Sequence, residues 1–433
     1  MCQAQAAEKA APRKSTAEGA QAKAAPKTPP PWKPVQPVAG AEPVLSAPAA
    51  ILVDAETGQV LWQRNAAARM YPASLTKMMT GLLAVETRRL EQVHRASETA
   101  AKTGESSISL QTGEELKLQQ VLRAALIKSA NDATVMVAES VAGSVPAFVQ
   151  MMNERAQALG MTGTHFANPH GLHDPAHYST AADLARLAQQ AMLNPTFARI
   201  VGTREAVIPW PGKPWSRKLV NRNRLLLRWD KCDGIKTGYT RQAGRCLAAS
   251  ATFDGWRLIC VVLKSQDSWS DAQTLLEWGT LNYRRQKVAR RREVYRARVH
   301  RGARRFVEAQ PVADLYAIGH IGQFISPAVQ EEGLCEAPVE FGQIVGQLRS
   351  ASGATVQLIA IEPMPLSLWA RACDVKAPQA ALGLLALLAA GVLLHGASAK
   401  TARARRRRLA ARERESDRSG TSDDRRADST PGE

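Results

Sequence analysis

The stretch Tyr71-Pro-Ala-Ser-Leu-Thr-Lys-Met-Met-Thr80 decides how the rest of this chain is organised. It places Ser74 three residues before Lys77, and an apolar run follows at roughly helical spacing. Residues three apart share one face of a helix, so the hydroxyl and the amine can touch. Pro72 stands where helices commonly begin, which puts Ser74 in the first turn, where free backbone N–H groups can help to hold a developing oxyanion.

A serine hydroxyl is a weak nucleophile at neutral pH and needs a base beside it. Lys77 can be that base only if burial or a second cation lowers its pKa. The S-x-x-K spacing alone carries little information, because an ordinary helix with one exposed lysine has the same pattern. A catalytic interpretation of Ser74 and Lys77 therefore depends on the rest of the chain.

Two further short motifs follow in order, Ser129-Ala-Asn131 and Lys236-Thr-Gly238. An S-x-x-K motif followed by S-x-N-type and K-T-G motifs is the pattern of β-lactamases and penicillin-binding proteins. Each motif is weak by itself, but three in this order within one region strongly indicate serine acyl-transfer chemistry.

The residue types of the first two motifs fit the steps of that chemistry. Ser74 attacks a carbonyl carbon, and Lys77 accepts the hydroxyl proton. Ser129 can relay a proton to the leaving amine. Asn131 can hold either the substrate amide or Lys77.

The third motif supplies charge and space. Lys236 adds a positive charge that lowers the pKa of Lys77 and attracts a substrate carboxylate. Thr237 offers its hydroxyl to the same carboxylate. Gly238 lets an extended substrate lie against a strand edge with no side chain in the way.

The length of 433 residues predicts two or three domains with real cores, and the formal net charge is +18. Basic residues are concentrated at 284–305 and 400–414. No RNP, zinc-finger or helix-turn-helix motif accompanies them, and a polyanionic envelope or an anionic lipid surface explains them as well as nucleic acid does. The cysteines lie far apart without C-x-x-C spacing, which argues against zinc and leaves disulfides open; they are Cys2, Cys232, Cys246, Cys260, Cys335 and Cys373.

The first part of the chain divides into a linker and a catalytic region. Residues 1–45 are rich in Ala, Pro, Lys and Gln, which predicts a disordered linker, and no apolar signal segment is visible there. Residues 46–282 have strand patterns at both ends and helices between them, which predicts an α/β (α+β) domain. The three ordered motifs that this region contains resemble those of the β-lactamase/transpeptidase type, so we expect the domain to be of that type. The expected elements include a hairpin over 49–64, a helix over 118–143 with Ser129 in its middle, and strands at 245–252 and 256–263.

The second part predicts a small domain and an anchor. Residues 283–375 alternate in short segments between turns, which predicts a small all-β, β-sandwich-like domain. The stretch 377–399 carries no charged residue and is long enough to span a bilayer, so we expect a transmembrane helix at 376–399. The arginine-rich tail 400–433 follows, and the positive-inside rule then predicts a cell-membrane protein with this tail in the cytoplasm and the preceding domains outside. We assign the tail's arginines to lipid headgroups and expect no nucleic-acid partner.

At this point the chain resembles a known family, the D-alanyl-D-alanine carboxypeptidases. These are the low-molecular-mass penicillin-binding proteins among the S-x-x-K acyltransferases. The resemblance covers about residues 46–375 and extends to the C-terminal anchor. Four stretches carry it: Pro72-Ala-Ser-Leu-Thr-Lys-Met-Met-Thr80, Asn168-Pro-His-Gly-Leu172, His177-Tyr-Ser-Thr-Ala181 and Asp233-Gly-Ile-Lys-Thr-Gly-Tyr-Thr240.

The resemblance implies an enzyme that removes the terminal D-alanine from peptidoglycan pentapeptide stems through an acyl-enzyme on Ser74. It also implies covalent inhibition by β-lactams and no cofactor. In the family the oxyanion hole comes from the backbone N–H groups of the serine and of the residue after K-T-G, here Ser74 and Tyr239.

Two positions depart from the family pattern. Ala130 stands where glycine is usual, a small change that we expect to be tolerated. The loop 263–269 has no arginine, although some relatives use one there to bind the terminal carboxylate of the substrate. That contact is then left to Lys264 or to Thr237 alone.

A metal site and a β-lactamase are two competing interpretations of parts of the sequence. A histidine-rich stretch beside Asp174 suggests a metal site, but its Gly- and Pro-containing loop pattern favours no metal; its members are His165, His170, His173 and His177. A class A β-lactamase needs a glutamate between the second and third motifs, and the nearest lookalike, at Glu277, lies after Lys236, so at most weak β-lactamase activity is expected.

Three further functions stay open at the level of sequence. A membrane-bound β-lactam sensor would need a signalling domain, and the tail 400–433 contains none that is recognisable. A purely structural cell-wall binding protein would have no use for an intact set of Ser74, Lys77 and Lys236. Endopeptidase side activity is compatible with the same residues.

Overall fold

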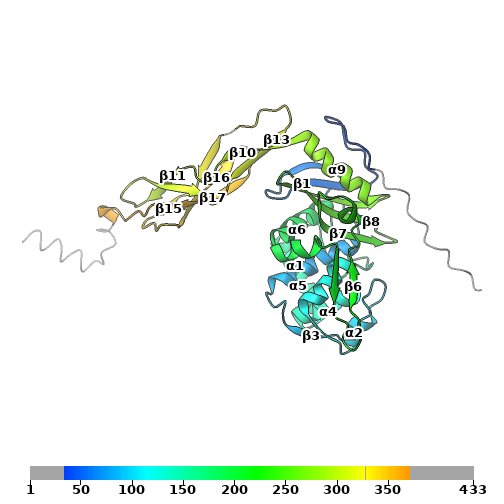
Figure 1. The fold of residues 1–433 in the computed structure, drawn as a ribbon. Helices are drawn as coiled ribbons and strands as arrows, with labels where there is room; N and C mark the ends of the chain where they lie inside the picture. The colour runs from blue at the N-terminus through cyan, green and yellow to red at the C-terminus, as the bar shows by residue number, and fades with distance from the viewer. Residues whose placement is uncertain (1–33, 327, 371–433) are drawn as a thin grey trace, which may run out of the picture. The chain divides into compact units, whose positions relative to one another are not determined.

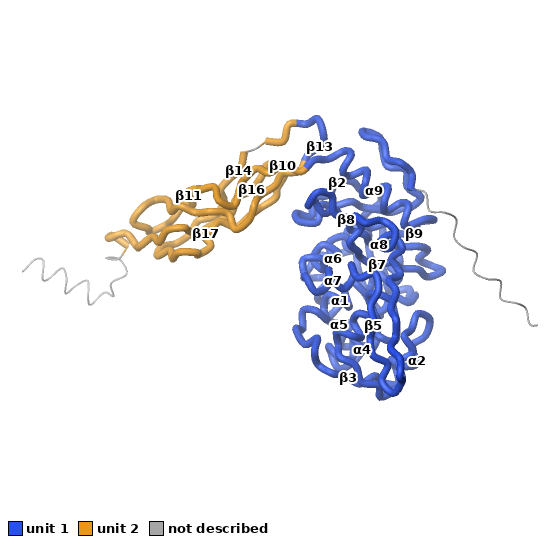
Figure 2. Tube along the Cα trace, viewed as in Figure 1, with its two compact units in different colours: residues 1–284, 319–323 blue, residues 285–318, 324–433 orange. Residues whose placement is uncertain are grey.

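The computed structural model describes residues 34–326 and 328–370, which form two compact units (Figure 2). Unit 1 holds the described residues up to Arg284 together with Gly319–Gln323, and unit 2 holds Arg285–Ile318 and the described residues from Phe324 onward. The expected membrane helix at 376–399, the tail at 400–433 and residues 1–33 of the expected linker lie outside the described residues. Within the described ranges no single helix is long and apolar enough to cross a membrane. One sharply bent pair of helices, Asn131–Ala142 and Val145–Ala158, reaches the required length and apolar composition only when the two are taken together.

Unit 1 is built on a five-stranded antiparallel sheet with the order β2-β1-β9-β8-β7 (Figure 1). The predicted hairpin over 49–64 is confirmed as β1 and β2, and the two predicted later strands are confirmed as β8 and β9. The K-T-G motif lies inside β7, a strand at the edge of this sheet. The strand bounds are Ala49–Asp54 (β1), Val60–Arg64 (β2), Cys232–Thr240 (β7), Gly244–Phe253 (β8) and Trp256–Ser265 (β9).

The sheet is covered on both faces because its strands are apolar on both sides. Successive side chains of a strand point to opposite faces. Leu52 and Leu258 pack closely around Gly279 of helix α9, Ser268–Asn282, on one face. Ile51 and Val261 belong to the core shared with the other helices, on the opposite face. The result is a layered α/β unit, as the sequence predicts.

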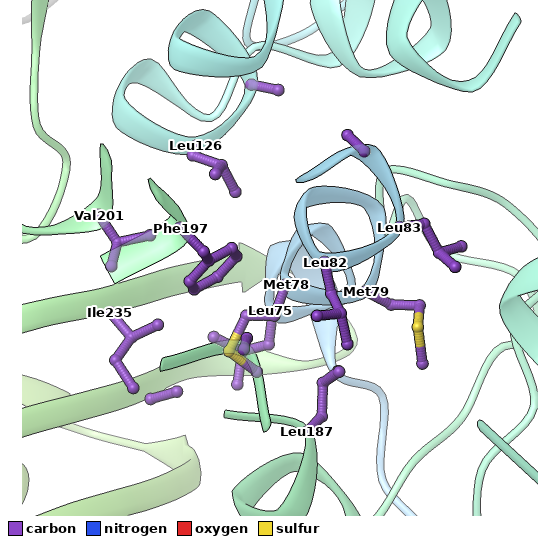
Figure 3. Packing of buried hydrophobic residues seen from close by; sticks show 14 of the residues in the cluster. Leu75, Met78, Met79, Leu82, Leu83, Leu126, Leu187, Phe197, Val201 and Ile235 are labelled. Carbon is purple, nitrogen blue, oxygen red and sulfur yellow. The ribbon is translucent and has the colours of Figure 1, made fainter. Parts of the chain in front are cut away.

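The helix that follows Ser74 runs through the middle of this core. Helix α1 is buried from its first residue to Val85, which explains why it is apolar all round rather than on one stripe. Phe197 of α7 and Leu126 of η2 lie against Gly81 of this helix, and the side chains of Met78 and Leu82 belong to the same core cluster (Figure 3). The helices of this layer are α1 (Lys77–Glu86), α3 (Leu118–Arg123), η2 (Ala124–Lys128), α4 (Asn131–Ala142), α5 (Val145–Ala158), α6 (Ala181–Leu193) and α7 (Pro195–Val201).

The helix predicted over 118–143 is interrupted, so the placement of Ser129 in its middle is wrong. The π-helical turn η2 follows α3, Ser129 adopts a left-handed conformation with φ of 62°, and α4 begins at Asn131. A π-helical turn carries one more residue per hydrogen-bonded loop than an α-helix, and such turns occur often at functional sites. Ser129 therefore lies at a break between helices.

Short elements complete unit 1 around these layers. Two small antiparallel strand pairs and two short helices complete the unit, and the second pair is followed by α8 and then by β7. They are β3 (Val93–Arg95) with β4 (Glu115–Lys117), β5 (Glu205–Ile208) with β6 (Arg217–Val220), α2 (Glu98–Lys102) and α8 (Arg224–Arg228).

The chain before β1 is fixed to unit 1, although residues 34–45 were expected to belong to the disordered linker. Thr274 Oγ1 of α9 donates to the carbonyl of Val35 at 2.9 Å, and Trp278 Nε1 donates to the carbonyl of Ala41 at 2.6 Å. The Gly40 N–H donates to Asn282 Oδ1 at 2.7 Å. Backbone groups of a segment with few large apolar residues are thus satisfied by side chains of one helix.

Unit 2 is the predicted small all-β part of the chain. Its six-stranded sheet has the order β14-β16-β17-β12-β11-β15, and the pair β10-β13 packs on the same core, as Ala289 and Leu315 show. In β11 Ala297 and Val299 are buried whereas Arg296 and its alternating neighbours are exposed, which is a solvated strand face. The bounds are β10 (Tyr283–Ala289), β11 (Tyr295–His300), β12 (Phe306–Pro311), β13 (Leu315–His320), β14 (Val329–Glu332), β15 (Cys335–Glu336), β16 (Ile344–Ser350) and β17 (Thr355–Ala360).

The described cysteines are free thiols. Cys232, Cys246 and Cys260 are buried in or beside the sheet of unit 1, and desolvation raises the pKa of each. The fold of the described residues is therefore held without a disulfide.

Candidate active site

The three predicted motifs, far apart in sequence, meet around Lys77. Ser74 lies in the 3₁₀ turn η1, Ala73–Thr76, and Lys77 is the first residue of α1. The Lys77 ammonium is completely buried and lies 3.0 Å from Ser74 Oγ, 2.8 Å from Asn131 Oδ1 and 2.7 Å from the carbonyl oxygen of His170. The predicted contact between the hydroxyl and the amine is thus present, and Asn131 contacts the lysine.

Burial is the main cause of a shifted titration at Lys77. Desolvation lowers its pKa well below the usual value, and the positive charge of Lys236 lowers it further. The charges of Glu105 and Asp132 act in the opposite direction and are smaller effects. Lys77 is therefore much easier to deprotonate than a lysine in water, which is the condition that a lysine base requires.

Lys236 and Ser129 form a second pair beside the first. Lys236 Nζ, also buried, donates to Ser129 Oγ at 2.9 Å and to the carbonyl of Thr237 at 2.9 Å. Burial, followed by the charge of Arg222, lowers the pKa of Lys236 to about 7. Near neutral pH this lysine can thus both hold and release a proton.

Gly238 brings the edge of β7 against the turn that carries Ser74. A Cβ atom at Gly238 would lie 3.0 Å from the Ser74 backbone nitrogen and 3.1 Å from the carbonyl oxygen of Pro72. Any side chain there would crowd the backbone of the turn at Ser74. The glycine of the motif is therefore required by a close approach between backbones.

A cavity of about 410 Å³ opens beside Ser74, and it has the size of a small-molecule or peptide-end site. Its walls include Ser129 and Asn131 on the helical side and Thr237, Gly238 and Tyr239 on the side of β7. Tyr239 is largely exposed. Ser74 and the other predicted site residues thus border the cavity or, as Lys77 and Lys236 do, lie buried directly beneath its lining.

Several neighbours of the nucleophile were missed by sequence reasoning. Thr76 Oγ1 donates to the carbonyl of Ala73 at 2.8 Å and lies 2.7 Å from His177 Nε2. The Ala167 N–H donates to His177 Nδ1 at 3.0 Å, so the proton of this neutral ring is on Nε2 and is donated to Thr76. This series of hydrogen bonds runs from His177 through Thr76 to the carbonyl of Ala73. Ala73, which has a left-handed φ of 49°, is the first residue of the turn that contains Ser74.

The loop before α6 also closes over this turn. A Cβ at Gly171, which has φ of 86°, would lie 1.9 Å from the Ala73 carbonyl oxygen, and Thr80 Oγ1 donates to the carbonyl of Pro169 at 2.6 Å. The only signal in the sequence was the family-like stretch Asn168-Pro-His-Gly-Leu172. Its contribution is made largely by backbone atoms, which residue types do not reveal.

The four histidines considered for a metal site have other contacts. The ring of His177 is engaged with Thr76, and His170 Nδ1 accepts from the Leu172 N–H at 3.2 Å. His165 Nδ1 lies 2.7 Å from the carbonyl of Ala176, and His173 packs edge-on against Tyr71.

Lys264, one of the two expected carboxylate ligands, does not border the cavity. Three arginines that were not among the predicted site residues do border it, namely Arg222, Arg224 and Arg245. Thr237, the other expected ligand, is part of the lining.

Comparison with known proteins agrees with this geometry. The family model described as D-alanyl-D-alanine carboxypeptidase, peptidase family S11, matches residues 36–267. The chain is 35% identical over 316 residues to the D-alanyl-D-alanine carboxypeptidase DacF of Bacillus subtilis, which covers 70% of this chain and 80% of the relative. It is 32% identical to DacA of Haemophilus influenzae over 71% of this chain and 81% of that one. Among solved structures, penicillin-binding protein 5 from Haemophilus influenzae superposes with a TM-score of 0.61 at 29% identity, covering 75% of this chain and 99% of that one.

An α/β unit with a serine, a buried lysine and a K-T-G strand edge around one cavity defines a serine hydrolase of the penicillin-binding class. Within that class the chain belongs to the D-alanyl-D-alanine carboxypeptidase family, peptidase family S11. The predicted family, enzyme class and catalytic fold are confirmed by these matches.

Proposed function

We propose that this enzyme removes the terminal D-alanine from peptidoglycan stem peptides through an acyl-enzyme on Ser74, and that β-lactams acylate the same hydroxyl. The observation that carries the proposal is the fully buried Lys77, with a lowered pKa, 3.0 Å from Ser74 Oγ at the wall of a cavity. Family membership supports the substrate class.

The contacts of Lys77 support a first proton transfer from Ser74 to Lys77. A neutral amine has two N–H donors and one lone pair. The carbonyl oxygens of Asn131 and His170 can only accept, so they take the two donors and leave the lone pair for the Ser74 hydroxyl. Ser74 Oγ then forms a bond to the penultimate carbonyl carbon while its proton passes to Lys77.

The leaving D-alanine needs a proton on its nitrogen when the C–N bond breaks. Ser129 supplies its hydroxyl proton and is reprotonated by Lys236, which donates to it at 2.9 Å. The backbone N–H groups of Ser74 and Tyr239 hold the negative oxygen of the tetrahedral intermediate. Water then adds to the ester carbon, and the proton that it loses restores Lys236 through Ser129. The Ser74 oxygen leaves and recovers its proton from Lys77.

Mass spectrometry of the full chain in detergent tests this proposal. After exposure to benzylpenicillin, wild type is expected to carry one adduct on the peptide that contains Ser74, and Ser74→Ala none. The same pair is then assayed for D-alanine release from a D-Ala-D-Ala peptide. A folded wild type with neither an adduct nor released D-alanine would refute the assignment.

We also propose that residues 376–399 anchor the enzyme in the cell membrane with the catalytic unit outside and 400–433 in the cytoplasm. The uncharged apolar stretch followed by arginines supports this. Protease treatment of intact spheroplasts is expected to degrade the catalytic unit and spare an epitope placed at the C-terminus. Degradation of the epitope alone would reverse the orientation, and recovery of the full chain in the soluble fraction would exclude the anchor.

A further inference from the structure

The reaction proposed above leaves the terminal carboxylate of the substrate without an assigned partner. Of the two residues that the sequence offers, Thr237 borders the cavity and Lys264 does not. A single hydroxyl gives a carboxylate one hydrogen bond, whereas a guanidinium adds a positive charge and can bind both carboxylate oxygens at once. The structure contains a cationic candidate on the strand next to the K-T-G motif.

A β-bulge explains why Lys264 is directed elsewhere. Arg245 of β8 pairs with Ser265 of β9, and the next paired residues are Leu247 and Val262. Two steps along β8 thus correspond to three along β9, so β9 carries an extra residue. Lys264 has a left-handed φ of 54°, and its Cγ lies 3.2 Å from the position that a Gly244 Cβ would take. Bulges of this kind redirect side chains.

Arg245, unlike Lys264, borders the cavity. Across the β7–β8 ladder it is the direct partner of Tyr239, so the two side chains share one face of the sheet. Thr237, two residues before Tyr239, points to that same face. The side chain of Arg245 is anchored by a hydrogen bond from Nη1 to the carbonyl of Gln266 at 2.7 Å. A guanidinium has five N–H donors in a planar fork that matches a carboxylate, so further donors remain after this bond.

The other two arginines of the cavity are engaged differently. The Arg224 guanidinium lies over the ring of Trp269, 5.2 Å from its centroid. Arg222 is close enough to Lys236 for its charge to lower the pKa of that lysine. Arg222 therefore acts on Lys236, the residue that donates to Ser129. Neither arginine is a neighbour of Thr237 on the sheet, as Arg245 is.

We propose that Arg245, together with Thr237, binds the terminal carboxylate of the D-Ala-D-Ala substrate and selects peptides that end in a free acid. Because this inference rests on the proposed function, its test compares two substrates on the same enzyme. Each variant of the full chain is assayed with a D-Ala-D-Ala peptide acid and with the matching C-terminal amide, which lacks the negative charge.

Wild type is expected to prefer the acid. In Arg245→Ala, kcat/KM for the acid should fall by about tenfold to 100-fold, mainly through KM, while kcat/KM for the amide stays within about twofold. Arg245→Lys should recover part of the loss. The matched control is Arg241→Ala, which removes an exposed arginine of the connection between β7 and β8. Arg241 does not border the cavity, so both values should stay unchanged.

Three results would overturn the inference. In the first, Arg245→Ala keeps the full preference for the acid. In the second, its kcat/KM falls by the same factor for the acid and for the amide. In the third, Arg224→Ala loses the preference for the acid while Arg245→Ala keeps it. A failure of the proposed function looks different, because the unmodified enzyme would then cleave neither peptide.

Discussion

At Lys77 burial and a neighbouring cation favour the same protonation state. Desolvation penalises the ammonium, and the charge of Lys236 penalises it again. Since the proposed base is active only as the free amine, the rate of serine acylation should rise with pH as Lys77 loses its proton. Lys236 then has two effects on that rate, one through its own contacts and one through the pKa of Lys77.

The second effect can be isolated by a pH profile. In Lys236→Gln the positive charge beside Lys77 is gone, so the pKa of Lys77 rises and the rising limb of the acylation rate moves to higher pH. The second-order rate of benzylpenicillin acylation, measured across pH, gives the shift. Lys264→Gln, which removes an exposed lysine outside the cavity, should leave the profile in place. An unshifted limb in Lys236→Gln would contradict the coupling.

Thr76 allows a test of positioning without touching the reacting atoms. Thr76→Val removes the hydroxyl that joins His177 to the Ala73 carbonyl, so the turn that presents Ser74 loses its support. Acylation by benzylpenicillin is expected to slow by about tenfold. Thr76→Ser keeps the hydroxyl and should react at nearly the wild-type rate. If both variants lose the same activity, or if Thr76→Val loses thermal stability but not rate, the role is only structural.

At this scale the sequence predicted contacts that depend on side-chain type and local spacing. The pair Ser74 and Lys77 is local, and the contact of Asn131 with Lys77 is one of the two roles that the motifs suggested for Asn131. The hydrogen bond between Lys236 and Ser129 was not predicted. The carbonyl of His170 was missed because every residue has one, so its use as a lysine acceptor leaves no pattern. Arg245 was missed because its direction depends on a bulge in the adjoining strand.

Among the elements, the loop before β4 is fixed to β6 by a buried ion pair. Both side chains are almost completely buried, and Arg217 binds the Glu114 carboxylate through two nitrogens at 2.6 and 2.8 Å. Arg217 Nε also donates to the carbonyl of Ile108 at 2.8 Å. Glu105 and Ser106 of the same loop border the cavity. The ion pair therefore supports one wall of the site.

Removing one partner of this pair leaves a buried charge without compensation. Glu114→Ala is expected to lower the free energy of unfolding by about 3–5 kcal/mol. The next residue supplies the control, because Glu115 forms an exposed pair with Arg95 and Glu115→Ala should cost about 0–1 kcal/mol. Denaturant titration of both variants measures the difference. Equal losses of unfolding free energy in the two variants would show that the buried ion pair stabilises the fold no more than the exposed one does.

Elements with long, regular patterns were predicted from sequence, and interruptions were not. Strands β8 and β9 follow their apolar periodicity closely. The break at Ser129 was not predicted, because the apolar residues of α3, η2 and α4 read as one continuous helix. The extra residue of the π-helical turn changes which face each later residue takes, and no single residue type marks it.

On the scale of the molecule, the segment before β1 contributes to unit 1. A chain that begins at residue 44 loses the contacts of Val35, Gly40 and Ala41 with α9. Loss of these hydrogen bonds is expected to lower the unfolding temperature by roughly 5 °C. A chain that begins at residue 34 retains them and serves as the matched control. Calorimetry of the two truncated chains compares them, and equal midpoints would show that the segment adds no stability.

The division into a catalytic α/β unit and a small β unit could be predicted because the hydrophobic period changes near residue 283. The end of the linker could not be predicted, because residues 34–45 have the composition of a disordered segment. Their order comes from α9, whose Thr274, Trp278 and Asn282 side chains bind backbone groups. Composition indicates how much apolar surface a segment can bury, but not which hydrogen-bond partners another element provides for its backbone.

The burial of Lys77 and Lys236 has a consequence for selection by antibiotics. A substitution of either lysine that weakens β-lactam acylation also leaves buried acceptors without a donor, such as the carbonyl of His170, and so removes both the reaction and part of the stability. Changes on the exposed rim, where Arg224 and Arg245 lie, leave no buried acceptor without a donor. Under drug pressure, resistant alleles of this gene should therefore accumulate at the rim and leave the two lysines unchanged.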